Sequence, residues 1–141
     1  MVRRIDQFCE NLRQKLTMID CGLDGLKAKI DANARNAERH VQSHLERVRK
    51  RIDQGRTKVS AARVDVAIWA QDRDTITIDT IAVWKTKRDV EKLQGRADKA
   101  ERYAAAAAEV ATAAIDEAEQ ASLEAWLAQA DVGYAKSKLT A

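Results

Sequence analysis

The chain has 141 residues, with 25 lysine and arginine residues against 22 aspartate and glutamate residues and a formal net charge of +3. Hydrophobic residues make up 45% of it, and it contains no proline, five glycines and two cysteines. This composition excludes collagen-like chains, Pro/Gly-rich disordered chains and disulfide-stabilised scaffolds. No stretch approaches the roughly 20 uncharged apolar residues of a membrane span. Because Asp6 and Glu10 precede any apolar run, the start does not resemble a secretory signal. We therefore expect one helical domain over residues 1–141, in the cytoplasm.

Residues 5–30 carry apolar side chains at alternating spacings of four and three, which is typical of one apolar stripe on a long helix. The positions are Ile5, Cys9, Leu12, Leu16, Ile19, Leu23, Leu26 and Ile30. Beyond Ile30 the pattern shifts to a longer period and continues to Ile52. It predicts one helix over about residues 3–53. Gly22 and Gly25 weaken this helix, but the pattern keeps its phase across them and favours continuity over a break.

A turn is expected near residues 54–57. Gly55 follows a run of cations, which suit the negative end of a helix, and Thr57 offers a hydroxyl that can cap the next one. A long helix running through this region is the alternative.

Residues 59–92 fit two structures. Alternating apolar side chains at Val64, Val66 and Ile68, followed by a polar run, are typical of a β-hairpin over residues 64–84 with a turn near 71–75. Apolar residues that recur every seven positions fit a helix instead. We favour the helix, because the segment contains neither proline nor glycine and regular helical sequence flanks it.

The last third of the chain repeats small apolar residues at spacings of four and three, and we call this series the alanine ladder. Its members are Leu93, Ala97, Ala100, Ala104, Ala107, Ala111, Ala114, Ala118, Ala121, Ala125, Ala128, Val132, Ala135 and Leu139. Small side chains let two helix axes approach closely, so the ladder predicts a tightly packed helix–helix contact. Asp98 and Glu101 form a possible capping pair, which would place a turn near residues 94–97.

A second apolar face lies opposite the ladder near the carboxyl end. Leu123, Trp126, Leu127 and Tyr134 group together on a helical wheel, with Ala130 among them. A helix that is apolar on two sides is normally sandwiched between neighbours. This face is either part of the core of the same chain or a partner-binding surface, where a tryptophan is the usual kind of anchor.

Charge is unevenly distributed along the chain. Residues 35–58 carry eight basic and three acidic residues, whereas residues 104–135 carry six acidic residues and no basic one. Opposite charges of this kind can set the register of paired helices. Arg47, Arg49, Lys50 and Arg51 form the one basic cluster, a weak candidate for binding an anionic surface such as lipid, a storage granule or nucleic acid.

Few residues have the chemistry for catalysis or metal binding. His40 and His44 lie four apart, so a helix would place both rings on one face, but no third ligand completes a recognised metal motif. A packed, hydrogen-bonded His44 is the expected state. Cys9 and Cys21 are expected to be free thiols. No phosphate-binding loop or nucleophile motif is present, so we expect no catalytic residue, metal or cofactor.

These patterns together predict an all-α fold of long antiparallel helices, two or three per chain, packed as a coiled coil or an elongated helical bundle. The function that fits is a non-catalytic coiled-coil protein, a homo-oligomeric scaffold or a protein–protein interaction module. Two alternatives stay open. One is an anionic-surface binder that uses the basic part of the first helix, although nucleic acid and membrane are the less favoured partners. The other is a small chaperone-like clamp, which needs the hairpin at residues 64–84.

Overall fold

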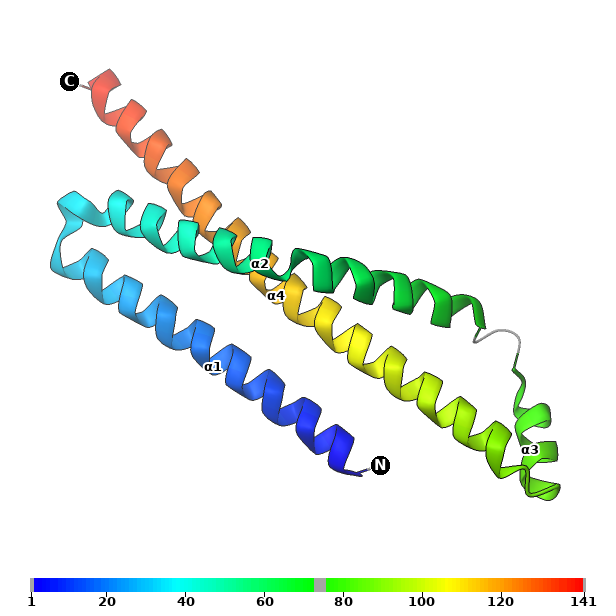
Figure 1. Cartoon of the computed structure of the whole chain (residues 1–141). Helices are drawn as coiled ribbons and strands as arrows, with labels where there is room; N and C mark the ends of the chain where they lie inside the picture. Colours follow the sequence, from blue (N-terminus) through cyan, green and yellow to red (C-terminus); the bar gives the residue numbers. More distant parts are fainter. Residues whose placement is uncertain (1, 73–75, 141) are drawn as a thin grey trace. The chain divides into compact units, whose positions relative to one another are not determined.

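The computed structural model describes residues 2–72 and 76–140, and these residues form four α-helices and one short 3-10 helix (Figure 1). The elements are α1 (Val2–Ala32), η1 (Ala34–Asn36), α2 (Ala37–Asp72), α3 (Ile78–Thr86) and α4 (Val90–Thr140). The all-α prediction is confirmed, although the described ranges hold four α-helices where two or three were expected. None of these helices combines the length and the apolar character that crossing a bilayer requires.

The chain divides into two compact units. The first comprises Met1–Gln54 and Ala114–Ala141, and the second comprises Gly55–Ala113. The first unit therefore contains α1, η1, the beginning of α2 and the end of α4, and the second contains the remaining parts of α2 and α4 together with α3. That residues 1–141 make up a single domain stays a prediction.

Helix α1 passes through Gly22 and Gly25, as expected, but it ends at Ala32. The predicted helix over residues 3–53 is therefore wrong at one point. Asn33 has an extended backbone with φ −149°, and its carbonyl accepts a hydrogen bond from the Asn36 N–H. Asparagine is a common turn residue, and the break falls on it and not on the glycines.

The turns expected near residues 54–57 and 94–97 are absent, because α2 and α4 run through them. Ile52 and Val59, about one turn on either side of Gly55, are half-buried. Helix α4 begins earlier than expected, at Val90, where the Asp89 carboxylate accepts a hydrogen bond from the Lys92 N–H. That capping bond satisfies one of the free donors at the start of a helix.

The segment that fitted both a hairpin and a helix is helical in its described part. Helix α2 extends to Asp72, and α3 begins at Ile78 after Thr77, whose hydroxyl accepts a hydrogen bond from the Thr80 N–H. No strand occurs in residues 64–72 or 76–84. The turn expected near residues 71–75 falls largely on residues 73–75, which lie outside the described residues.

The core of the first unit joins three helices. Leu26 of α1, Val41, Leu45 and Val48 of α2, and Leu123 of α4 are buried together. Partly buried side chains pack around them, namely Leu23, Ile30, Ile52 and Leu127. The apolar pattern read along the first half of the sequence thus identifies the core positions of α2 and of the second half of α1.

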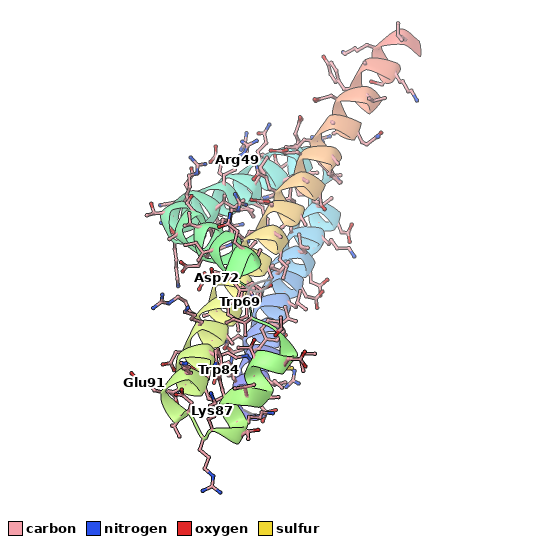
Figure 2. All side chains as sticks on the ribbon, turned by 90° about the vertical axis from the view of Figure 1, so that its right-hand side faces the viewer. Arg49, Trp69, Asp72, Trp84, Lys87 and Glu91 are labelled. Atoms are coloured by element: carbon pink, nitrogen blue, oxygen red, sulfur yellow. The ribbon has the colours of Figure 1, made fainter. Side chains whose placement is uncertain are left out.

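The second unit is held mainly by small and aromatic side chains of α2 and α4. Among its described residues, the buried apolar ones are Ala62 and Ala106. Trp69 stacks on Tyr103 with ring centroids 5.2 Å apart, a favourable aromatic arrangement. On α3, Trp84 lies 5.9 Å from the ammonium group of Lys92, and Figure 2 shows both tryptophans within this unit.

The alanine ladder does not form the predicted packed face. Most of its members are exposed, including Ala104, Ala111 and Ala118. The buried side of α4 follows a different phase, through Ala106, Asp116 and positions further along the helix. Alanine buries too little apolar area to define a face on its own, so the larger side chains of α4 decide which side packs within the chain.

Candidate functional site

A cluster of charged side chains lies inside the first unit, next to its apolar core. Asp116 and Glu119 of α4 are buried, with 7% and 6% of their surface exposed. An isolated buried carboxylate is costly, so each requires cationic partners. Arg51 of α2 supplies one to both carboxylates, and Lys15 of α1 supplies a second to Asp116.

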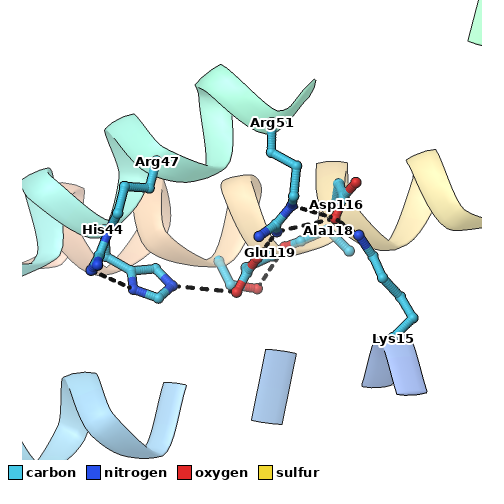
Figure 3. A network of polar contacts seen from close by, with 8 residues as sticks. Lys15, His44, Arg47, Arg51, Asp116, Ala118 and Glu119 are labelled. Atoms are coloured by element: carbon cyan, nitrogen blue, oxygen red, sulfur yellow. Dashed lines mark hydrogen bonds and ion pairs between the residues drawn. The ribbon is translucent and has the colours of Figure 1, made fainter. Parts of the chain in front are cut away.

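The geometry of this charged cluster is tight (Figure 3). The Lys15 Nζ lies 2.7 Å from Asp116 Oδ1, and the Arg51 Nη2 lies 3.0 Å from the same oxygen. Arg51 also donates from Nε to Asp116 Oδ1 at 3.1 Å and from Nη2 to Glu119. Two carboxylates thus face two permanent cations, and three helices are joined at one point. No buried side-chain N or O among the described residues lacks a hydrogen-bond partner.

His44 extends the charged cluster on the side of α2. Its Nε2 lies 3.4 Å from Glu119 Oε2, and its Nδ1 lies 3.4 Å from the Arg47 guanidinium. A guanidinium can only donate, so this arrangement suits an Nδ1 that accepts and an Nε2 that donates to the carboxylate. The expectation of a packed, hydrogen-bonded histidine is confirmed.

The other predicted metal candidate, His40, does not join His44 in a ligand set. Across residues 2–72 and 76–140, no group of three or more His, Cys, Asp or Glu side chains is placed to hold a metal ion. Cys9 and Cys21 are both exposed free thiols, as expected.

The basic cluster of α2 is divided among different neighbours. Arg51 faces the buried carboxylates, and Arg49 pairs with Glu124 of α4 at 3.0 Å. Arg47 contacts His44, while Lys50 is exposed. Two of the four candidate residues for an anionic surface are therefore engaged with α4.

The uneven charge along the sequence does pair α2 with α4. Arg49 with Glu124 and Arg51 with Glu119 join the two helices in the first unit. In the second unit, Lys58 pairs with Glu109 at 3.0 Å. The prediction that opposite charges match across paired helices is confirmed at these contacts.

The predicted partner-binding residues separate into two groups. Leu123 is buried in the core of the first unit, and Leu127 packs against that core. Trp126 and Tyr134 are exposed, with 38% and 67% of their surface accessible. The first pair therefore serves the chain itself, and only the second pair is presented at the surface.

Sequence reasoning missed the buried roles of Lys15, Asp116 and Glu119. The available signal was position: Asp116 and Glu119 lie on the same side of α4 as Leu123, seven and four residues before it. Acidic residues on an apolar face, opposite a basic stretch of another helix, indicate a buried ion-pair cluster.

Two hydrogen bonds change the pKa of Glu124, a surface carboxyl of α4. Gln120 donates a hydrogen bond to it at 3.0 Å, and Arg49 donates another at 3.0 Å. These two bonds, that of Gln120 first, hold the pKa of the Glu124 carboxyl below its ordinary value. A depressed folded-state pKa means that the contribution of Glu124 to stability is present at neutral pH and is lost as the pH falls through that folded-state pKa.

Gln120→Ala is expected to raise the pKa of Glu124 toward its ordinary value, because the largest stabilising contact of the ionised form is removed. The measurement is a carbon-13 NMR titration of the glutamate side-chain carboxyls. Gln129→Ala, an exposed position on the same helix, is the control and should leave the titration unchanged. A Glu124 titration that is the same in Gln120→Ala and in the parent chain would contradict the assignment.

Comparison of the chain with protein-family models, with curated proteins and with solved structures finds no match.

Proposed function

We propose that the chain is a non-catalytic, cytoplasmic helical protein that assembles with a second copy of itself and serves as a scaffold or protein–protein interaction module. The observation that carries the proposal is the uncovered apolar surface at the end of α4. Leu123 of this helix is buried, but Trp126 and Tyr134, on the same side of the helix, are 38% and 67% exposed. Apolar surface of this kind is a usual mark of association.

The same face of α4 supports this proposal by its continuity. Leu123 and Leu127 pack within the chain, Ala130 is half-buried, and Tyr134 extends the series beyond the intrachain core. A second helix laid along this extension would continue the packing that the first unit begins. The alanine ladder does not carry the argument, because its predicted contact is not found within the chain.

Charge supports an antiparallel arrangement of two such helix ends. Asp131 lies three residues before Tyr134 and Lys138 lies four residues after it. In an antiparallel pair centred on Tyr134, the Asp131 of each copy approaches the Lys138 of the other. Complementary charges of this kind fix register and orientation more than they add affinity.

Tyr134→Asp is expected to convert the oligomer into a monomer, because a carboxylate would replace an aromatic ring at the centre of the proposed contact. The measurement is solution mass by light scattering over a range of concentrations. Trp126→Asp, at the edge of the same surface, is expected to weaken the assembly as well.

Ile78→Asp serves as the matched control, because Ile78 is 85% exposed and belongs to α3 of the second unit. It should leave the solution mass unchanged. A parent chain that is monomeric at every concentration, or a Tyr134→Asp variant with the parent's mass, would overturn the self-association proposal.

A further inference from the structure

A pocket of about 190 Å³ lies in the first unit, between α1 and the beginning of α2, apart from the exposed end of α4. Six residues of its wall carry the argument: Cys21, Gly25, Lys29, His40, Ser43 and Arg47. The α2 residues lie three and four apart, so they share one face of that helix. We propose that this pocket binds a phosphate group, either inorganic phosphate or the phosphate of a monoester.

The charge of the wall selects for an anion. Lys29 and Arg47 bring two permanent positive charges, and no carboxylate belongs to the wall. Lysine and arginine offer several N–H donors, and a guanidinium matches the oxygen geometry of phosphate. The same two cations repel a metal ion, in agreement with the missing metal ligand sets in the described ranges.

The donors of the wall are available to a ligand. Within the part of the chain that the structure describes, the side chains of Lys29, His40 and Ser43 take part in no hydrogen bond or ion pair with other residues. Among the residues that the structure describes, the polar partner of the Arg47 guanidinium is His44, whose other ring nitrogen bonds to Glu119. His44 thereby positions Arg47 at the pocket while the charged cluster positions His44.

Glycine opens the pocket on the α1 side. A Cβ built on Gly25 would meet no heavy atom within 4 Å, so open space lies over this position. At Gly22 a Cβ would approach the His44 ring at 3.5 Å. Glycine inside a helix costs about 0.5–1 kcal/mol relative to alanine, and here the missing side chain leaves room between two helices.

Size restricts the ligand class. Pockets for drug-sized ligands usually measure roughly 300–1,000 Å³, so a cavity of about 190 Å³ suits a small group. A tetrahedral oxyanion fits this volume and can take donors from both helices at once. Such a phosphate is carried both by soluble molecules and by lipid headgroups, and the experiment separates these two sources.

The test is titration of the full chain with inorganic phosphate and with a soluble phosphomonoester, followed by amide NMR shifts at constant ionic strength. Saturable shifts at the pocket residues are expected with phosphate, and chloride should not produce them. Lys29→Gln and Arg47→Gln are each expected to weaken binding by about tenfold or more, because each removes a charge-assisted contact. Both residues are exposed, so these variants are expected to fold.

A pair of glycine variants separates pocket filling from helix stabilisation. Gly25→Met places a side chain over the pocket and is expected to abolish phosphate binding. Gly133→Met, on α4 of the same unit, also meets open space but lies away from the pocket, so it should bind phosphate like the parent. Tyr134→Asp should likewise keep phosphate binding, which makes failure of this proposal distinguishable from failure of self-association.

The lipid source is tested by sedimentation with vesicles of phosphatidylcholine alone or with phosphatidic acid. Binding to phosphatidic acid that is lost in Gly25→Met assigns the headgroup to the pocket. Vesicle binding that persists in Gly25→Met would overturn this assignment, since it would come from charge elsewhere on the surface. The proposal as a whole is overturned if neither source binds the parent chain, or if Gly25→Met and Lys29→Gln bind phosphate as the parent does.

Discussion

Leu45→Ala is expected to lower the free energy of unfolding by about 2–5 kcal/mol, the range for removing a buried leucine side chain from a core. Leu45 is 3% exposed and packs in the middle of the α2 series, between Val41 and Val48. The core of the first unit contains few fully buried side chains, so loss of one removes a large share of its apolar contacts. The cavity left behind adds to the lost transfer free energy, because the neighbouring helices relax only in part.

The measurement is urea-induced unfolding followed by far-ultraviolet circular dichroism. Leu139→Ala is the matched control: it makes the same substitution on α4, where Leu139 is 86% exposed. A change at such a position is usually within about 0.5 kcal/mol. If the two variants were destabilised equally, the assignment of Leu45 to the core would be wrong.

The helical class and the core positions of α2 were predictable because they depend on local sequence. An unbroken apolar pattern without proline identifies both, and Val41, Leu45 and Val48 follow it to the centre of the core. The same pattern is less informative about α1. Leu26 is buried, but Ile5 and Leu16, which belong to the same series, are 63% and 48% exposed. Periodicity indicates which side of a helix is apolar, and it does not indicate where along the helix a partner covers that side.

The helix ends were harder to predict than the helices. Gly55 and the Asp98–Glu101 pair suggested turns, yet both lie inside helices. The cost of a glycine in a helix, about 1 kcal/mol, is small beside the packing of a long amphipathic face. The real ends fall at polar residues: the backbone carbonyl of Asn33 accepts a hydrogen bond from Asn36, and the side chain of Asp89 accepts one from Lys92. Asn33 ends the run of α1, and Asp89 caps α4 after Arg88, which adopts a left-handed backbone with φ 54°. Such ends depend on one or two local hydrogen bonds and leave little trace in a periodic pattern.

The site was least predictable on α4, where the phase of the buried side was misread. The alanine ladder is the more regular series, but the buried side contains Asp116 and Glu119, which break any apolar pattern. Their burial depends on cations from α1 and α2 that are distant in sequence. Charge complementarity between α2 and α4 was visible in the sequence, whereas the contribution of Lys15 from α1 required the fold.

Arg51→Met tests whether this charged cluster holds the first unit together. The change removes the cation shared by Asp116 and Glu119 while keeping most of the apolar stem of the side chain. Breaking a buried ion pair by removing one partner typically costs about 3–5 kcal/mol, since the other charge is left without compensation. Arg51 itself is 35% exposed and Lys15 still serves Asp116, so we expect a loss of free energy of unfolding near the lower end, about 3 kcal/mol.

The origin of that loss can be isolated by adding Glu119→Gln to Arg51→Met. If the cost comes from an uncompensated carboxylate at Glu119, whose side chain is 3% exposed, removing its charge should restore much of the lost stability. Arg49→Met is the matched control on the same helix, because its partner Glu124 is a surface group and exposed ion pairs contribute little. All variants are compared by urea unfolding at neutral pH. If Arg51→Met and Arg49→Met lowered the free energy of unfolding equally, the buried ion pairs of Asp116 and Glu119 would contribute no more than the exposed pair. If Arg51→Met were much more destabilising and Glu119→Gln restored the lost stability, the contact among the three helices would depend on balanced charge in this cluster.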